Sequence, residues 1–257
     1  MVVNGVRNGR KIKPPVTAII QARMQSKRLP RKSLMDLGGR PLLSHVIERA
    51  RAIEGVDRVV VATCDGEENL GIIELAREMN TGVFVGSHDD VLERYCFAAR
   101  EFGGDYIVRV TGDNPFTDPE YASMAVEIAL EARTDLCVIP NLPLGAAVEV
   151  IKREALEEAC RHGEKPYHRE HVTPYIKEHP ELFHIEKPAV SFKNPYPEMR
   201  LTVDTPEDYE FAQALYRELY RGEIFSLSDV VEYLKKNPGL MDINKQVEQR
   251  TMRHSES

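Results

Sequence analysis

Five basic side chains follow a short apolar run near the start of the chain. The run, residues 17–20, reads Thr-Ala-Ile-Ile, which has the length of a strand and no helical period. The cations that follow it are Arg23, Lys27, Arg28, Arg31 and Lys32. Guanidinium and ammonium groups match phosphate in charge and geometry, and open α/β sheets bind ligands beyond the carboxyl ends of their strands. The pattern therefore predicts a phosphate-binding loop at a sheet edge. Charge alone also allows a solvated surface loop, a protease-sensitive linker or a nucleic-acid patch.

Two aspartates, Asp113 and Asp204, each end an apolar segment and precede a turn that contains proline. If both segments are strands that point the same way, their carboxylates reach the sheet edge where the basic loop emerges. Two carboxylates facing bound phosphate would repel it unless a cation lay between them. Mg²⁺ is the natural candidate, because it binds few carboxylates together with phosphate oxygens. The alternatives are that Asp113 only forms a turn and that Asp204 only caps a helix.

The neighbouring sequence predicts the elements that would position these groups. Strands are expected at residues 17–20, 58–63, 83–85 and 106–110. Helices are expected from Pro41, over 67–79 and 89–102, and after the cap Asp118. This alternation predicts an α/β fold with a mostly parallel, three-layer central sheet and right-handed crossovers.

The second half of the chain predicts a mixed extension of that sheet. Strands are expected at residues 135–139, 147–151, 183–186 and 199–203, and helices at 152–161 and 168–177. Thr205 and Asp208 form a capping box for the next helix, and a last helix begins near Ser226 or Ser228. We expect one domain over residues 16–242, between a flexible tail at 1–15 and a frayed tail at 243–257.

Composition and charge limit the classes of function. The formal net charge of −7 makes the molecule as a whole repel nucleic acid, so the basic loop is a local device for a small anion. The four cysteines include no CxxC pair, which argues against structural zinc and favours reduced thiols in the cytoplasm. No apolar run approaches the length of a membrane span, and residues 1–15 lack the apolar core of a signal peptide.

Several segments together resemble a known family. Residues 21–34, QARMQSKRLPRKSL, resemble the first motif of the cytidylyltransferases that make CMP-activated acidic sugars, such as CMP-Kdo and CMP-sialic acid synthetases. A closer resemblance is to the branch named after spore coat polysaccharide biosynthesis protein F. It is carried by GSHDDVLERY (86–95), VRVTGDNPF (108–116), REHVTPYI (169–176) and RLTVDTPEDYE (200–210). The resemblance covers residues 17–219 and implies a Rossmann-like nucleotidyltransferase fold that uses CTP and releases pyrophosphate.

The resemblance also implies roles for the residues at matching positions. On the nucleotide side, Arg23, Arg28 and Lys32 would hold the triphosphate and act in catalysis, and Ala22 would contact the nucleotide. Asp113 would contact the nucleotide and hold Mg²⁺ together with Asp204. The base would lie near Ala62, Thr63 and Cys64, with Arg94 and Arg109 close to the nucleotide or the acceptor. The acceptor side would be lined by Glu149, Arg169, Glu170 and His171.

His171 has two interpretations within this resemblance. Its imidazole titrates in the range that a general base for an acceptor hydroxyl requires. It could instead bind the acceptor's carboxylate or face a helix interface, and a hydroxyl activated by Mg²⁺ would need no base.

The chain departs from the family pattern at two positions. Arg31 stands where relatives usually carry Gly in an RLPGK pattern, so its side chain would either crowd the phosphate turn or add a phosphate contact. Ala147 stands where many relatives have Asp, which leaves the identity of the acceptor open.

Two other functions compete with transfer of CMP to an acidic sugar for surface polysaccharide or glycoconjugate biosynthesis. The chain could be a catalytically inactive, nucleotide-binding regulatory protein. It could also be a sugar-1-phosphate nucleotidyltransferase, although the stretch QARMQSKRLP lacks the glycine-rich opening motif of that class. The expected partners are CTP and a small anionic acceptor, with no nucleic acid and no membrane. A homodimer formed through residues 135–190 is possible.

Overall fold

The computed structural model describes residues 6–7, 10–11, 13–190, 196 and 198–249. Its main sheet has seven strands in the order β11-β9-β10-β8-β3-β6-β7. These strands are β3 (Val16–Gln21), β6 (Arg58–Cys64), β7 (Gly82–Gly86), β8 (Tyr106–Thr111), β9 (Leu136–Val138), β10 (Glu149–Lys152) and β11 (Ile185–Glu186). Strands β8, β3, β6 and β7 are mutually parallel, whereas β10 pairs antiparallel with both β8 and β9. The expected mostly parallel sheet with a mixed extension is therefore confirmed.

The α-helices are α1 (Leu42–Arg51), α2 (Leu70–Glu78), α3 (Val91–Phe102), α4 (Pro119–Ala132), α5 (Arg153–His162), α6 (Pro166–His171), α7 (Pro174–Glu178), α8 (Pro206–Leu219) and α9 (Leu227–Lys236). Three short 3-10 helices are η1 (Lys32–Leu34), η2 (Glu67–Asn69) and η3 (Pro238–Asp242). Two small antiparallel pairs join β1 (Val6–Arg7) to β2 (Arg10–Lys11) and β4 (Asp36–Leu37) to β5 (Arg40–Pro41).

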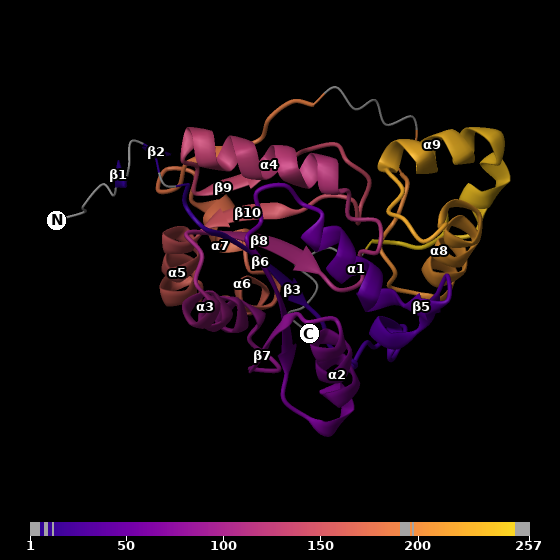
Figure 1. The fold of residues 1–257 in the computed structure, drawn as a ribbon, viewed down its shortest axis with the longest axis horizontal. Helices are drawn as coiled ribbons and strands as arrows, with labels where there is room; N and C mark the ends of the chain where they lie inside the picture. The colour runs from indigo at the N-terminus through magenta and orange to yellow at the C-terminus, as the bar shows by residue number, and fades with distance from the viewer. Residues whose placement is uncertain (1–5, 8–9, 12, 191–195, 197, 250–257) are drawn as a thin grey trace.

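Alternate residues of each central strand enter two separate apolar cores, one on each face of the sheet. On β3, Ala18 and Ile20 belong to the core that packs against α1, α2, α4, α8 and α9. Ile19, which points the other way, belongs to the core formed with α3, α5 and α7. The sheet thus lies between two helical layers, with α8 and α9 together at one end of the molecule (Figure 1). This arrangement is the expected three-layer α/β fold.

Two expected elements differ from the structure. Residues 199–203 do not form a strand, because their amides bond to loops: Leu201 N donates to Leu144 O and Val203 N to Asp113 O. This close approach requires Gly145, where a Cβ atom would lie 2.5 Å from the nitrogen of Thr202. The single helix expected at 168–177 is divided into α6 and α7, because the backbone leaves the helical region at Val172, with φ 72°, and Pro174 has no N–H to continue the helical hydrogen bonds.

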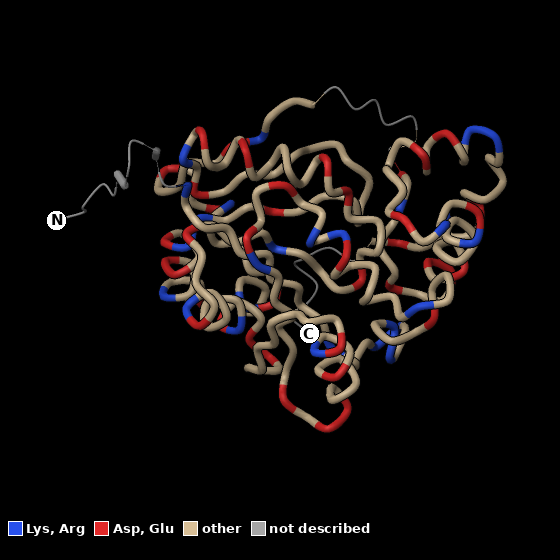
Figure 2. The backbone as a smooth tube through the Cα atoms, viewed as in Figure 1, with Lys and Arg blue, Asp and Glu red and all other residues tan. Residues whose placement is uncertain are grey.

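Both ends of the expected domain carry local structure. β1 and β2 lie within residues 1–15, of which 1–5, 8–9 and 12 fall outside the described part. Residues 250–257 of the expected tail at 243–257 also fall outside it, whereas Asn244 is buried and hydrogen-bonded. None of the helices in the described part has the length and apolarity to cross a bilayer. Basic and acidic residues are interspersed along the described chain (Figure 2), which fits a basic loop of local purpose.

Candidate functional site

The loop that carries the basic side chains leaves the sheet where the order of its parallel strands reverses. β3 lies between β6 and β8. The chain continues from β3 to β6 and β7 on one side of it and then crosses to β8 on the other side. Gly112 N, just beyond β8, donates to Gln21 O at 2.8 Å, and a Cβ on Gly112 would lie 2.9 Å from the Cβ of Ala22. The start of the basic loop and the segment leading to Asp113 are therefore held side by side. This switch point is where open α/β sheets bind their ligands.

Lys32 joins the two predicted aspartates. Its Nζ donates to Asp113 Oδ2, to Asp204 Oδ1 and to the carbonyl oxygen of Val203, each at 2.8 Å. The three side chains are largely enclosed, with exposed fractions of 10% for Lys32, 26% for Asp113 and 19% for Asp204. Asp113 and Asp204, which lie 81 and 172 positions after Lys32 in the sequence, thus both pair with its ammonium group. The spatial convergence expected from the strand ends is present.

Electrostatics in this cluster favour the charged forms of Lys32 and Asp113. Burial opposes the charge of Lys32, but the Asp113 and Asp204 carboxylates outweigh burial and raise the pKa of the ammonium above its usual value. Burial likewise opposes the charge of Asp113, and the neighbouring Lys32 ammonium outweighs it and lowers the pKa of that carboxyl. Lys32 and Asp113 are therefore both ionised at neutral pH.

The second oxygen of Asp204 faces arginines. Arg28 Nη2 lies 3.1 Å from Asp204 Oδ2, and Arg200 Nη2 lies 3.8 Å from it. Arg200 also forms a bidentate pair with Asp208, through Nε at 3.2 Å and Nη2 at 3.1 Å. Asp208 in turn accepts hydrogen bonds from the amides of Asp204 and Thr205 at 3.1 and 3.2 Å. The predicted capping box of α8 is present, and its acid also fixes the backbone of Asp204.

The end of β6 lies next to the basic loop. Ala22 N donates to Ala62 O at 3.2 Å, and Ala62, Thr63 and Cys64 are all buried. The hydroxyl of Thr63 is enclosed without a hydrogen-bond partner among the described residues. The resemblance predicts that the cytosine base of the nucleotide lies next to these three residues.

Asn69 connects these two loops and escaped the sequence reasoning. It is fully buried, and its Oδ1 accepts a hydrogen bond from Met24 N at 2.9 Å. Its Nδ2 donates to Asp65 O at 3.2 Å and to Cys64 Sγ at 3.4 Å. One amide side chain therefore fixes the basic loop against the loop after β6.

The two expected arginines that flank the nucleotide or acceptor occupy different settings. Arg94 is buried on α3 and donates to Ser87 O at 2.8 Å, and burial lowers its pKa. Arg23 is a charged neighbour of Arg94. Arg109, on β8, lies 3.0 Å from Glu149 on β10 and donates to Gln21 at 3.3 Å. The Nε atoms of Arg94 and Arg109 are both buried without a partner among the described residues.

Glu149 is the centre of a second charged cluster. Besides Arg109, it accepts hydrogen bonds from Thr173 Oγ1 at 2.9 Å and from Lys177 Nζ. Burial opposes its charge, but Arg109 and Lys177 outweigh burial and lower its pKa. Thr173 and Lys177 were not predicted as site residues. Thr173 lies within the quoted segment REHVTPYI and Lys177 directly after it, so polar residues around that segment were the available signal.

Of the other predicted acceptor residues, one joins this cluster and one lies elsewhere. His171 is half-buried, and burial lowers its pKa; its charged neighbours are Glu170, Arg109, Glu149 and Lys177. Arg169 instead pairs with Asp90 at 3.3 Å, at the cap of α3. The structure thus places His171, with its chain neighbour Glu170, beside the Glu149 cluster, whereas Arg169 pairs with Asp90.

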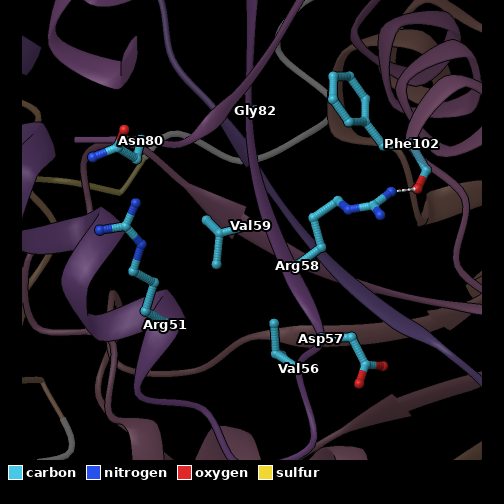
Figure 3. Close-up of a pocket in the computed structure, with 8 residues that line it drawn as sticks. All are labelled: Arg51, Val56, Asp57, Arg58, Val59, Asn80, Gly82 and Phe102. Carbon is cyan, nitrogen blue, oxygen red and sulfur yellow. Dashed lines mark hydrogen bonds between the residues drawn. The ribbon is translucent and has the colours of Figure 1, made fainter. Parts of the chain in front are cut away.

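Two surface pockets contrast in position. A pocket of about 550 Å³ lies at the amino-terminal ends of β6 and β7 (Figure 3). The Lys32 cluster, in contrast, includes Asp113, which follows the carboxyl-terminal end of β8. In the first pocket, Arg51 bonds to Met79 O and Thr81, and Arg58 to Phe102 O, so both arginines neutralise carbonyls at the ends of α2 and α3. A second pocket, of about 390 Å³, adjoins the Lys32 cluster, because Arg28 and Thr205 line it.

The sheet order and the three layers define a nucleotidyltransferase-type α/β fold. A solved cytidylyltransferase from Leptospira borgpetersenii superposes with a TM-score of 0.83 at 31% identity, covering 93% of this chain and 99% of that one. A family model described as cytidylyltransferase matches residues 17–245. The chain belongs to this cytidylyltransferase family.

Two curated relatives are informative. The spore coat polysaccharide biosynthesis protein SpsF of Bacillus subtilis is 35% identical over 225 residues, which are 86% of this chain and 94% of that protein. A 3-deoxy-manno-octulosonate cytidylyltransferase of Anaeromyxobacter dehalogenans is 33% identical over 180 residues, covering 62% of this chain and 72% of that protein. The resemblance found from the motifs is therefore confirmed at the level of the family.

Proposed function

We propose that this protein transfers CMP from CTP to an acidic sugar, or a similar anionic acceptor, with release of pyrophosphate. The supporting observation is the contact of one ammonium, that of Lys32, with both Asp113 and Asp204 at the switch point of the sheet. Family membership supplies the nucleotide class, and the two relatives connect the family with polysaccharide biosynthesis and an acidic sugar. A role in surface polysaccharide or glycoconjugate biosynthesis is part of the proposal.

The residues present fit the magnesium ion that such chemistry uses. Among the described residues, no group of three or more His, Cys, Asp or Glu could hold a metal. The carboxylates of Asp113 and Asp204 nevertheless converge on one cation, the Lys32 ammonium, and two carboxylates are as many as Mg²⁺ usually takes when phosphates supply the rest. Asp113 and Asp204 would hold the ion, which would neutralise charge on the phosphate oxygens.

The chain's own cations would hold the triphosphate. Transfer of a nucleotidyl group needs in-line attack on the α-phosphorus, and charge gathers on the leaving pyrophosphate oxygens. Lys32 contacts both aspartates, Arg28 contacts Asp204, and Arg23 belongs to the same loop. Their role is to bind the phosphates and to stabilise the developing charge.

The second cluster suits an anionic acceptor. Glu149 pairs with two cations, Arg109 and Lys177, so one carboxylate is shared between two positive side chains, and a sugar carboxylate could pair with them as well. His171 adjoins it, and its lowered pKa keeps the imidazole neutral at pH 7, the form that can accept a proton from an acceptor hydroxyl. We therefore assign His171 to the acceptor side, as a base or as a binding residue.

Release of pyrophosphate tests this function. The purified protein is incubated with Mg²⁺, a panel of acidic sugars and either CTP, UTP, dTTP or GTP. We expect release with CTP and at least one acidic sugar. A preference for UTP or dTTP would identify a sugar-1-phosphate nucleotidyltransferase instead, and CTP binding without release across the panel would identify an inactive regulatory protein.

We also propose a cytoplasmic location and a homodimeric assembly. All four cysteines are free thiols, which suits the cytoplasm. A homodimer through residues 135–190 is tested by light scattering of the wild-type chain at several concentrations.

A further inference from the structure

The segment that follows η3 contacts the residues around Asp204. Residues 243–248 form one side of the pocket of about 390 Å³, which is lined by Arg28, Thr205, Glu207, Ile243, Gln246, Val247 and Glu248. Arg28 and Thr205, on its other side, are an ion-pair partner and the chain neighbour of Asp204. We refer to residues 243–249 as the C-terminal strap.

Asn244 anchors this strap in the protein interior. The side chain is buried, and its Nδ2 donates to Asp208 Oδ1 at 3.0 Å and to Arg200 O at 3.2 Å. Both amide hydrogens are therefore used in two bonds to the residues that fix Asp204. At the end of the strap, Arg200 Nη1 donates to Gln249 Oε1.

Asp208 transmits this anchoring to Asp204. Its Oδ1 accepts from Asn244 and from Arg200 Nε, while its Oδ2 accepts from Arg200 Nη2 and from the amides of Asp204 and Thr205. A carboxylate with that many donors has one preferred orientation, because any rotation breaks several charge-assisted bonds at once. Asn244 supplies one of those bonds from outside the 200–208 segment.

We propose that the C-terminal strap is part of the nucleotide site and that Asn244 is a positioning residue for Asp204. It acts through Asp208, which holds the backbone at the carboxylate that pairs with Lys32 and Arg28. This inference rests on the proposed function for its ligand, CTP with Mg²⁺, whereas the positioning itself is a property of the free protein. A shift of that carboxylate by a fraction of an ångström weakens a site that requires exact distances to phosphate and metal.

The matched pair of variants is Asn244→Ala and Asn237→Ala. Asn237 lies in the same region and also donates from its Nδ2, to Tyr233 O at 3.0 Å, but none of its contacts leads to Asp204. Asn244→Ala loses two side-chain hydrogen bonds and Asn237→Ala loses one, so both variants are expected to have a lower melting temperature.

Two measurements decide the proposal. Hydrogen–deuterium exchange of the full chain without ligand is expected to be at least threefold faster at the amides of Asp204 and Thr205 in Asn244→Ala, and unchanged there in Asn237→Ala. Calorimetric titration with CTP and Mg²⁺ is expected to give a dissociation constant about tenfold higher for Asn244→Ala only. Unchanged exchange in Asn244→Ala overturns the positioning role, whatever the protein binds. Wild-type protein that fails to bind CTP refutes the proposed function instead, and the exchange data still decide the role of Asn244.

Discussion

Replacing Arg31 by glycine should stabilise the protein. Arg31 has φ 62° and ψ 14°, in the left-handed region, directly before η1. Its amide donates to Met24 O at 2.9 Å and its carbonyl accepts from Leu34 N at 3.0 Å, so the turn holds this conformation with either residue. The resemblance to an RLPGK pattern implies Gly at this position, which fits the left-handed backbone.

The size of the effect follows from two opposing terms. A residue with a Cβ costs about 1–2 kcal/mol in the left-handed region, which Gly avoids. Gly loses about 0.5–1 kcal/mol more conformational entropy on folding. The difference favours Arg31→Gly by about 1 kcal/mol, which corresponds to a melting temperature about 2–4 °C higher for a domain of this size.

The assay is thermal unfolding followed by circular dichroism, with Arg31→Ala as the matched control. The alanine variant loses the same exposed guanidinium but keeps the left-handed strain, so it should melt near the wild-type temperature. If Arg31→Gly melts at or below the wild-type temperature, or if Arg31→Ala gains as much, backbone strain is not the cause. The KM for CTP then separates the two interpretations of the side chain: a rise in both variants indicates a phosphate contact, and a fall indicates crowding.

Three further predictions concern the site. Lys32→Ala and Asp204→Asn should each lower the rate of pyrophosphate release by about 10²–10³, because each removes a group that meets the triphosphate or its metal; near-native CTP consumption by either folded variant would refute the assigned roles. If His171 is the base, burial places its pKa below the ordinary value, so the acidic limb of the kcat/KM profile should lie below pH 6.5 and disappear in His171→Ala; an unchanged profile eliminates the base and leaves the binding role. Asn69→Ala should raise the KM for CTP more than it lowers kcat, because it releases Met24 N and Asp65 O in two loops of the free protein; an unchanged KM would show that these loops hold their places without it.

The central elements were predictable because their signal is local. The strand at residues 17–20 is an apolar run too short for a helix, and its neighbours 58–63 and 106–110 are of the same kind. Residues 199–203 carry the same signal and their apolar side chains are buried in the main core, but their amides bond to loops at 113 and 144 rather than to a neighbouring strand. An apolar run indicates that a segment is buried, but it does not indicate which backbone groups will accept hydrogen bonds from its amides.

The candidate site was partly predictable for a related reason. The proximity of Asp113 and Asp204 could be predicted, because acids that follow the strands of a parallel sheet lie at the same edge of the sheet. The contact of Lys32 with both aspartates could not be predicted, because these residues lie 81 and 172 positions from Lys32 in the sequence and the contact depends on how the basic loop folds. The roles of Asn69 and Asn244 could not be predicted from the sequence. Asn69 bonds to Met24 N, and Asn244 bonds to Arg200 O and to Asp208, and neither kind of contact produces a recognisable spacing or charge pattern. The groups proposed to bind phosphate can thus be identified in the sequence by their charges, whereas the groups that hold them in position can be identified only in the folded structure.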